Sequence, residues 1–333
     1  MKQQFAAELA AGAQVDDVFV ISEKALAQKK NGENYLSITF SDKTGDIKGV
    51  AWDNVSAAAA AGAVGDFVRV RGGVSDYRGG LQLTVRELSP VDRGSVRRDD
   101  FLPATRRNPE RMMERLRQTA AEGIQDPDLL ALFAAFWSDE DFVDRFKRAP
   151  AGKKMHHAYL GGLLEHTLSM TVLIGDIAAH YSGIDTDILL AGTILHDIGK
   201  IREFKYDTLI DYSDEGKLLT HIVIGCGMLD EKLRQVPGFP KEKALLLKHM
   251  IVSHHGSREF GSPEPPRTLE AVLLNHIDDI DAKMNGLRGF IAKEDPRESW
   301  TAYNPMLRRQ LFRSGKEGNA PAGEDAPGEN GGE

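Results

Sequence analysis

A histidine and an aspartate stand side by side in the stretch GTILHDIGK, residues 192–200, where apolar residues lead into His196 and Asp197 and a glycine follows. Adjacent residues of a helix point about 100° apart, so this pair cannot stack on one helix face. Both side chains can, however, flank a metal ion that lies beyond the end of the helix. Because a carboxylate has two oxygens, Asp197 can bridge two ions, whereas His196 binds only one.

More histidines and acids follow in the same region, at predicted helix ends or beside other acids. The candidate ligands are His166, His196, Asp197, His221, His254, His255 and Asp278. Neutral imidazoles and carboxylates hold Mn, Fe, Mg or Zn without thiolates, and the single cysteine excludes a thiolate-rich site. The sequence therefore predicts a nitrogen–oxygen site with room for two ions. The plainer alternative is a set of core or helix-end histidines that only hydrogen-bond to neighbouring groups.

Lys200 lies four residues after His196, and we expect both on one helix face. An ammonium group there suits a phosphate oxygen, although a cation near the end of a helix can also simply complement the helix dipole. Two ions joined by a carboxylate are the usual arrangement for in-line hydrolysis of a phosphoester. We therefore predict Asp197 and Lys200 as catalytic residues.

The region that carries these residues has helical periodicity throughout. A helix is expected from Pro109, a favoured first residue, to Gly123, a favoured stop. Further helix-length segments with apolar faces follow at residues 161–181, 185–201, 215–236, 241–256 and 267–291. No alternating strand pattern interrupts them, so residues 108–313 are predicted to form an all-α domain.

The N-terminal part has β-structure instead. In residues 34–42, Leu36, Ile38 and Phe40 alternate with polar residues, which indicates a half-buried strand. Strands are also expected after a turn at residues 44–45 and over residues 66–74 and 80–88, with a short helix before the last two. Together with an opening strand from about residue 15, this is the element order of a five-stranded OB barrel, predicted over residues 13–92. Another small barrel or sandwich is the alternative.

Length and charge bound the remaining organisation. A chain of 333 residues favours two domains, here joined by a charged linker over residues 93–107. The Gly-, Pro- and acid-rich residues 314–333 hold five carboxylates against one lysine and are expected to be disordered. A net charge of −8 does not mark the chain as a polyanion binder. No signal peptide or membrane span is recognisable, and one cysteine fits a reducing compartment, so we expect a cytoplasmic protein.

The ordered set H…HD…H…HH…D across a helical domain resembles the HD superfamily of metal-dependent phosphohydrolases. More of the chain resembles the YhaM-type 3′→5′ exoribonucleases, through NYLSITFSDKTGDIKGVAWD, HHAYLGGLLEHTLSM, LLAGTILHDIGKI, HMIVSHHG, GSPEPPRTLEAVLLNHIDDIDAKM and WTAYNPMLRRQLFR, with the OB module in front. This resemblance extends over nearly all of residues 15–313. It implies an OB domain that binds nucleic acid and an HD domain that hydrolyses it.

By this resemblance, His166, His196, Asp197 and Asp278 match the core ligands of the superfamily. His221, His254 and His255 match the extra ligands of its two-metal members, and the first carboxylate of the DDID run, Asp278, matches the motif. The family implies manganese, two ions, and single-stranded RNA as substrate, with DNA to a degree. Alternatives are a nucleotide or cyclic-nucleotide phosphohydrolase and a non-catalytic single-strand-binding protein; the HHGSREFGSPEPP stretch lacks the Gly-Tyr-Pro loop expected of a cyclic-dinucleotide enzyme.

Five residues of the predicted barrel are candidates for nucleic-acid contact. Tyr35, Trp52 and Tyr77 could stack on bases, and Lys48 and Arg69 could bind phosphates. Aromatic residues on strands are more often part of a core, so burial is the alternative for the first three. The sequence does not indicate an oligomeric state.

Overall fold

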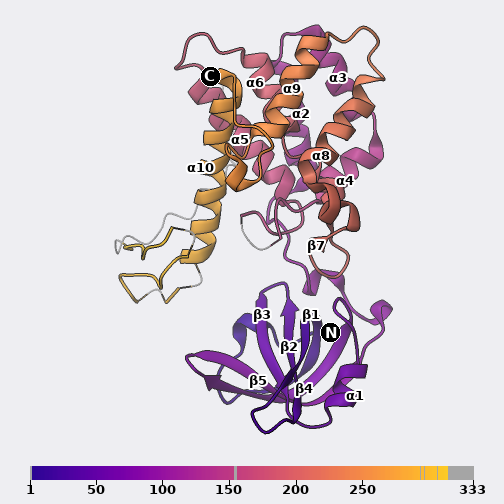
Figure 1. The fold of residues 1–333 in the computed structure, drawn as a ribbon, viewed down its shortest axis with the longest axis vertical. Coiled ribbons are helices and arrows are strands. Elements are labelled where there is room, and N and C mark those ends of the chain that lie inside the picture. The colour runs from indigo at the N-terminus through magenta and orange to yellow at the C-terminus, as the bar shows by residue number, and fades with distance from the viewer. Residues whose placement is uncertain (1, 154–155, 293, 296, 306, 314–333) are drawn as a thin grey trace, which may run out of the picture. The chain divides into compact units, whose positions relative to one another are not determined.

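The computed structural model describes residues 2–153, 156–292, 294–295, 297–305 and 307–313. The chain divides into two units, Met1–Lys283 and Met284–Glu333 (Figure 1). The first unit holds a β-barrel and, after it, a helical domain. The acidic tail that we predicted to be disordered, residues 314–333, lies outside the described residues.

Five strands close into a barrel in the order β1-β2-β3-β5-β4. The elements are β1 (Gln14–Gln28), β2 (Asn34–Asp42), β3 (Gly45–Ala51), α1 (Val55–Ala60), β4 (Phe67–Tyr77) and β5 (Gly80–Pro90). Neighbouring strands are antiparallel except β3 and β5, which pair in parallel and complete the closure. The predicted element order of an OB barrel is confirmed.

The barrel core is filled by the residues that alternation predicted. Leu36, Ile38 and Phe40 of β2 are all buried, and Phe40 packs against Phe19 of β1. Closing the barrel also requires a close backbone approach at Gly72, where the β4–β5 register shifts. A Cβ atom on Gly72 would lie 2.2 Å from the carbonyl oxygen of Thr84, so only glycine fits without a shift of the backbone.

Helices make up most of the second domain. They are α2 (Pro109–Gly123), α3 (Pro127–Trp137), α4 (Glu140–Arg148), α5 (Gly162–Ala178), α6 (Thr186–Leu195), α7 (Lys200–Glu203), α8 (Asp214–Leu233), α9 (Lys241–Ser253) and α10 (Leu269–Ile291). The predicted bounds of α2 are confirmed. Side chains cap five of these helices by accepting from free backbone N–H groups, at Asn108, Asp126, Asp139, Asp185 and Ser213.

Two features depart from a purely helical second domain. Two-residue strands β6 (Phe204–Lys205) and β7 (Asp211–Tyr212) pair between α7 and α8. They are too short to produce an alternating pattern, so the periodicity did not reveal them. The chain also leaves the helical conformation after Ile291, about twenty residues before the end that we predicted for the all-α domain.

The sequence predicted no membrane-spanning segment, and the helices of the structure can be compared with this prediction. Among the helices of the described residues, none is both long enough and apolar enough to cross a bilayer.

We predict that Gly72→Ala destabilises the barrel, because the added methyl group overlaps the Thr84 carbonyl. The expected loss is about 1–3 kcal/mol in the free energy of unfolding, measured by urea denaturation. Gly80→Ala is the matched control, since its nearest contact would be 4.0 Å away. Equal stability of the two variants would show that the close approach at Gly72 is not a constraint.

Candidate metal centre

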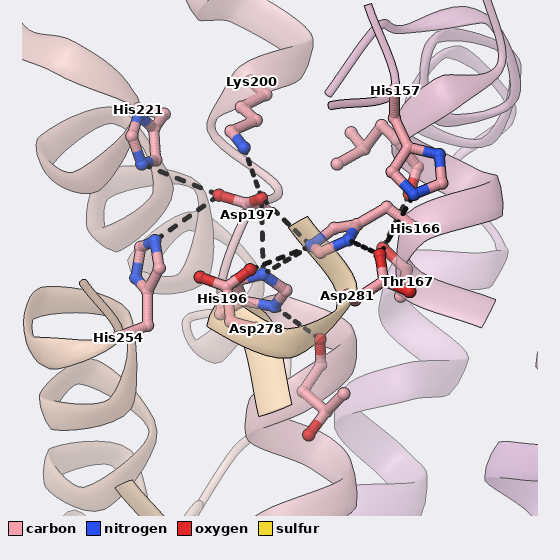
Figure 2. Close-up of polar contacts among 12 residues, drawn as sticks. His157, His166, Thr167, His196, Asp197, Lys200, His221, His254, Asp278 and Asp281 are labelled. Carbon is pink, nitrogen blue, oxygen red and sulfur yellow. Dashed lines mark hydrogen bonds and ion pairs between the residues drawn. The ribbon is translucent and has the colours of Figure 1, made fainter. Parts of the chain in front are cut away.

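Asp197 occupies the centre of a buried group of histidines and acids (Figure 2). Helix α6 ends at Leu195, His196 is its C-cap, and Asp197 lies in the turn before Lys200 begins α7. The expectation that Lys200 shares a helix face with His196 is therefore wrong, because the helix ends between them. Lys200 contacts Asp197 instead, with Nζ 2.5 Å from Oδ2.

The first cluster of ligand atoms surrounds Oδ2 of Asp197. His196 Nε2 lies 3.3 Å from this oxygen and His166 Nε2 lies 3.7 Å from it. The Nε2 atoms of His166 and His196 are 3.3 Å apart. Asp278 Oδ1 lies 3.3 Å from His166 Nε2. Helices α5 and α10 and the turn that follows α6 thus supply the four residues that match the core ligands of the superfamily.

The second cluster surrounds the other oxygen of the same carboxylate. His221 Nε2 on α8 and His254 Nε2 at the end of α9 each lie 3.6 Å from Asp197 Oδ1. Ligand atoms of His221, His254 and His255 all lie within 4.8 Å of one another. The structure therefore brings all seven predicted ligand residues together, in two groups on either side of Asp197.

Four buried atoms of the second cluster have no hydrogen-bond partner among the described residues: Asp197 Oδ1, His221 Nε2, His254 Nε2 and His255 Nδ1. Leaving a buried polar atom without a partner costs about 1–3 kcal/mol, so four that converge on one point require an explanation. An ion about 2.1 Å from each ligand would set the ligand atoms roughly 3.0–3.5 Å apart. Asp197 Oδ1 lies 3.6 Å from both His221 Nε2 and His254 Nε2, which is close to that spacing. The donor set fits a divalent ion.

Backbone carbonyls fix the orientation of two of these imidazoles. His196 donates from Nδ1 to the Thr193 carbonyl at 2.7 Å, and His254 donates from Nδ1 to the Ile251 carbonyl at 2.8 Å. Each ring therefore carries its proton on Nδ1 and directs the lone pair of Nε2 toward Asp197. Burial and the neighbouring His255 hold the pKa of His254 well below its usual value, so its ring is neutral.

Glu203 orients His221 in a different way. Its Oε1 accepts from both the backbone N–H of His221, at 2.9 Å, and the ring Nδ1–H, at 3.0 Å. This geometry coincides with a break in α8 at Thr220, whose φ of 60° is rare for a β-branched residue. Gly199 in the turn after Asp197 allows the approach of α8, because a Cβ there would lie 1.9 Å from the His221 carbonyl oxygen.

Asp281 orients His166, one helical turn after Asp278 on α10. Its Oδ2 accepts from His166 Nδ1 at 2.8 Å and from His157 Nε2 at 3.0 Å, and its Oδ1 accepts from Ser169 at 2.5 Å. These are direct hydrogen bonds, so we interpret this group as a support for His166 and not as a third metal site. The sequence prediction chose Asp278 from the DDID run and missed Asp281, although their i, i+3 spacing places both on one helix face.

The charges around Asp197 balance through burial and pairing. Burial alone would raise the pKa of Asp197, but Lys200 and the histidines hold it well below its usual value. Burial would likewise lower the pKa of Lys200, but Asp197 and Asp278 raise it. Both groups are thus charged at neutral pH, and this salt bridge leaves Oδ1 of Asp197 directed at the second cluster.

The barrel places two of its five predicted contact residues on the strands β2 and β3, and a third directly after β3. Tyr35 of β2 packs on Trp52, which follows β3, with ring centroids 5.0 Å apart, and Trp52 is 40% exposed. Lys48 is exposed on β3. Tyr77 is 53% exposed at the β4–β5 turn, with the guanidinium of Arg78 over its ring. In OB folds, the β2–β3 face and the β1–β2 and β4–β5 loops are the usual nucleic-acid contacts.

Arg69 lies apart from these residues, on β4 between β1 and β5. Its Nε donates to Asp16 Oδ1 at 2.6 Å, and Asp16 also pairs with Arg71. Its charge is thus shared with a carboxylate on the neighbouring strand, a partner that only the β1–β4 register reveals. Among the five predicted contact residues, the structure shows a direct contact only between Tyr35 and Trp52.

Comparison with known proteins matches two family models to this chain. The HD domain model matches residues 163–283, and an OB-fold nucleic acid binding domain model matches residues 20–91. The 3′-5′ exoribonuclease YhaM of Bacillus subtilis (strain 168) is 35% identical over 305 residues, which cover 91% of this chain and 95% of the relative. This chain belongs to the YhaM family. The YhaM protein of Geobacillus sp. (strain WCH70) is 34% identical over 303 residues, which cover 91% of this chain and 92% of that relative.

The YhaM match extends across both domains and confirms the resemblance inferred from the sequence. Among solved structures, a domain of replication protein A from Methanococcus maripaludis is similar to 27% of this chain and 94% of its own, at 21% identity and a TM-score of 0.24.

We predict that Asp281→Asn weakens metal binding about 10- to 100-fold. The neutral amide has one acceptor oxygen where the carboxylate uses two, so it holds the tautomer of His166 less firmly. Titration calorimetry with Mn²⁺ measures this change. Asp279→Asn, in the same DDID run, is the matched control, because Asp279 is exposed and, among the described residues, pairs with Lys283 alone, at 2.6 Å. If both variants bind Mn²⁺ equally well, Asp281 does not support the site.

Metal affinity should also rise with pH. Burial alone would lower the pKa of His166, but hydrogen bonds to Asp278 and Asp281 raise it to about 9 in the ion-free protein. This imidazole must lose a proton before Nε2 can bind an ion, so below pH 9 protons compete with the metal. Mn²⁺ affinity is expected to increase from pH 7 to about 9 and then level off. An affinity that is constant over this range would contradict this protonation state.

Proposed function

We propose that this protein is a metal-dependent 3′→5′ exoribonuclease that releases 5′-mononucleotides from single-stranded RNA. The observation that carries the proposal is the position of Asp197, whose two oxygens face two separate clusters of imidazole nitrogens. Membership of the YhaM family supports RNA as the substrate and the 3′ end as the point of attack. The site chemistry and the family thus favour the same reaction.

The side chains divide the work of phosphodiester hydrolysis among them. Divalent ions bound at such a site would supply a water of lowered pKa and positive charge near the phosphoryl oxygens. Asp197 would fix the separation of the two ion positions, and the histidines would hold them through oriented Nε2 atoms. Lys200, charged and next to Asp197, is the residue that we propose contacts a phosphate oxygen of the scissile group.

The barrel would hold the single strand that the helical domain shortens. Tyr35, Trp52 and Tyr77 offer rings for stacking, and Lys48 offers a charge for phosphates. Stacking and phosphate contacts do not read base edges, so we expect little sequence preference and binding that weakens with salt. By the same reasoning single-stranded DNA should also bind, because no contact in this set requires a 2′-hydroxyl.

We further propose manganese as the ion, two ions per chain, and a cytoplasmic location. A mixed imidazole and carboxylate set suits Mn²⁺, and the single cysteine fits a reducing compartment. Metal content after dialysis, measured by elemental analysis, tests the first two statements.

The nuclease activity is tested with 5′-labelled single-stranded RNA and Mn²⁺. The wild-type protein should produce a ladder that shortens from the 3′ end, and Asp197→Ala should lower the rate by on the order of a hundredfold or more, because both ion positions lose their shared ligand. Asp279→Asn should retain full activity. Equal rates for Asp197→Ala and the wild-type protein would refute the proposal.

A further inference from the structure

After α10, the described residues 299–305 and 307–313 form a small antiparallel hairpin that no part of the proposed mechanism uses. Its described residues are joined by backbone hydrogen bonds from Thr301 N–H to the Leu311 carbonyl, from Arg313 N–H to the Ser299 carbonyl and from Asn304 N–H to the Arg309 carbonyl. A side-chain bond adds to them, since Thr301 Oγ1 accepts from the Leu311 N–H at 3.0 Å. We call this segment the C-terminal hairpin.

In the C-terminal hairpin, polar side chains are buried and aromatic side chains are exposed, which is the opposite of a hydrophobic core. The polar residues Thr301 and Asn304 are buried, with exposed fractions of 1% and 5%. The large aromatic residues are exposed instead, Trp300 by 55%, Tyr303 by 58% and Phe312 by 62%. Exposed aromatic side chains that are held on an ordered segment are typical of a binding surface.

Two of these rings pack edge to face. Trp300 and Phe312 are directly paired across the hairpin, and their ring centroids are 5.1 Å apart at an interplanar angle of 60°. Opposed residues of an antiparallel pair project from the same face. The backbone bonds therefore fix an aromatic platform before any ligand arrives, which reduces the entropy that binding would cost.

The positive charge of the C-terminal hairpin indicates which class of ligand it would bind. Residues 299–313 contain three arginines and no carboxylate, whereas the whole chain has a net charge of −8. Arg308 and Arg309, at the turn of the C-terminal hairpin, are both exposed. Aromatic rings combined with arginines match the bases and phosphates of a single-stranded nucleic acid, because every base has a face that stacks.

We propose that the C-terminal hairpin is a second binding site for single-stranded RNA, separate from the barrel, in which Trp300 and Phe312 stack on bases and Arg308 and Arg309 contact phosphates. This inference rests on the proposed function for the identity of its ligand. It assigns substrate binding to a part of the chain that neither the HD nor the OB family model covers.

The test measures equilibrium binding of a fluorescent, unstructured RNA by anisotropy, in full-length protein that carries Asp197→Ala so that the RNA is not cleaved. Trp300→Ala and Phe312→Ala should each weaken binding roughly tenfold, the loss expected for one stacked base. Arg308→Ala combined with Arg309→Ala should reduce the slope of log K against log salt concentration by about 1.4, which corresponds to two lost phosphate contacts on a single strand.

Two controls separate binding from folding. Tyr181→Ala removes a ring of similar exposure, 57%, outside the C-terminal hairpin and should leave RNA binding unchanged. Trp300→Phe keeps an aromatic face and should restore most of the affinity. If the alanine variants of the aromatic residues fail to fold, the arginine pair decides, since a reduced salt slope supports the proposal and an unchanged slope overturns it.

Unchanged affinity in Trp300→Ala and Phe312→Ala would overturn the proposal. A change in oligomeric state of these variants, measured by light scattering, would also overturn it, because the aromatic platform would then pair with a second copy of the chain. Neither result bears on the nuclease activity, which is tested by RNA shortening with the unmodified protein. Conversely, a protein that does not shorten RNA fails the proposed function while its binding can still be measured.

Discussion

The structure depends on the burial of one carboxylate, that of Asp197. A buried charge costs free energy unless opposite charge or hydrogen bonds compensate it. Lys200 compensates Oδ2 at 2.5 Å, but Oδ1 faces only imidazole nitrogens, and none of these atoms has a hydrogen-bond partner in the described part of the chain. Lone pairs that face one another repel. A cation between them removes this repulsion, because each lone pair then forms a coordination bond. A domain that binds no ion has no explanation for this arrangement.

The rest of the helical domain positions the atoms around Asp197. Backbone carbonyls at two helix ends accept from the Nδ1 atoms of His196 and His254. Carboxylate oxygens of Glu203 and Asp281 accept from those of His221 and His166, respectively. The break in α8 at Thr220 and the close approach of α8 to Gly199 both help to position His221. Nδ1 has an acceptor in four of the imidazoles, those of His166, His196, His221 and His254. These hydrogen bonds fix the ring orientations before an ion binds, which is what a preorganised two-ion site requires.

Much of this could be predicted from the sequence, because the relevant patterns are local. Alternation in β2 and the proline and glycine that bound α2 depend on short spacings. The seven ligand residues are far apart in the chain, but they stand in short motifs that resemble those of the HD superfamily. The parts that were missed depend on contacts between distant segments. Glu203 meets His221 only through the break in α8, and Arg69 meets Asp16 across 53 positions of the chain. Lys200 was misplaced because the helical periodicity of residues 185–201 does not show that α6 stops at Leu195.

The most direct test of the two-ion account is a crystal structure of the protein grown with Mn²⁺ and measured at the manganese absorption edge. We expect two anomalous peaks, one on each side of the Asp197 carboxylate, the first bound by His166, His196 and Asp278 and the second by His221, His254 and His255. No peak at Asp197, or peaks only at surface carboxylates, would contradict the account.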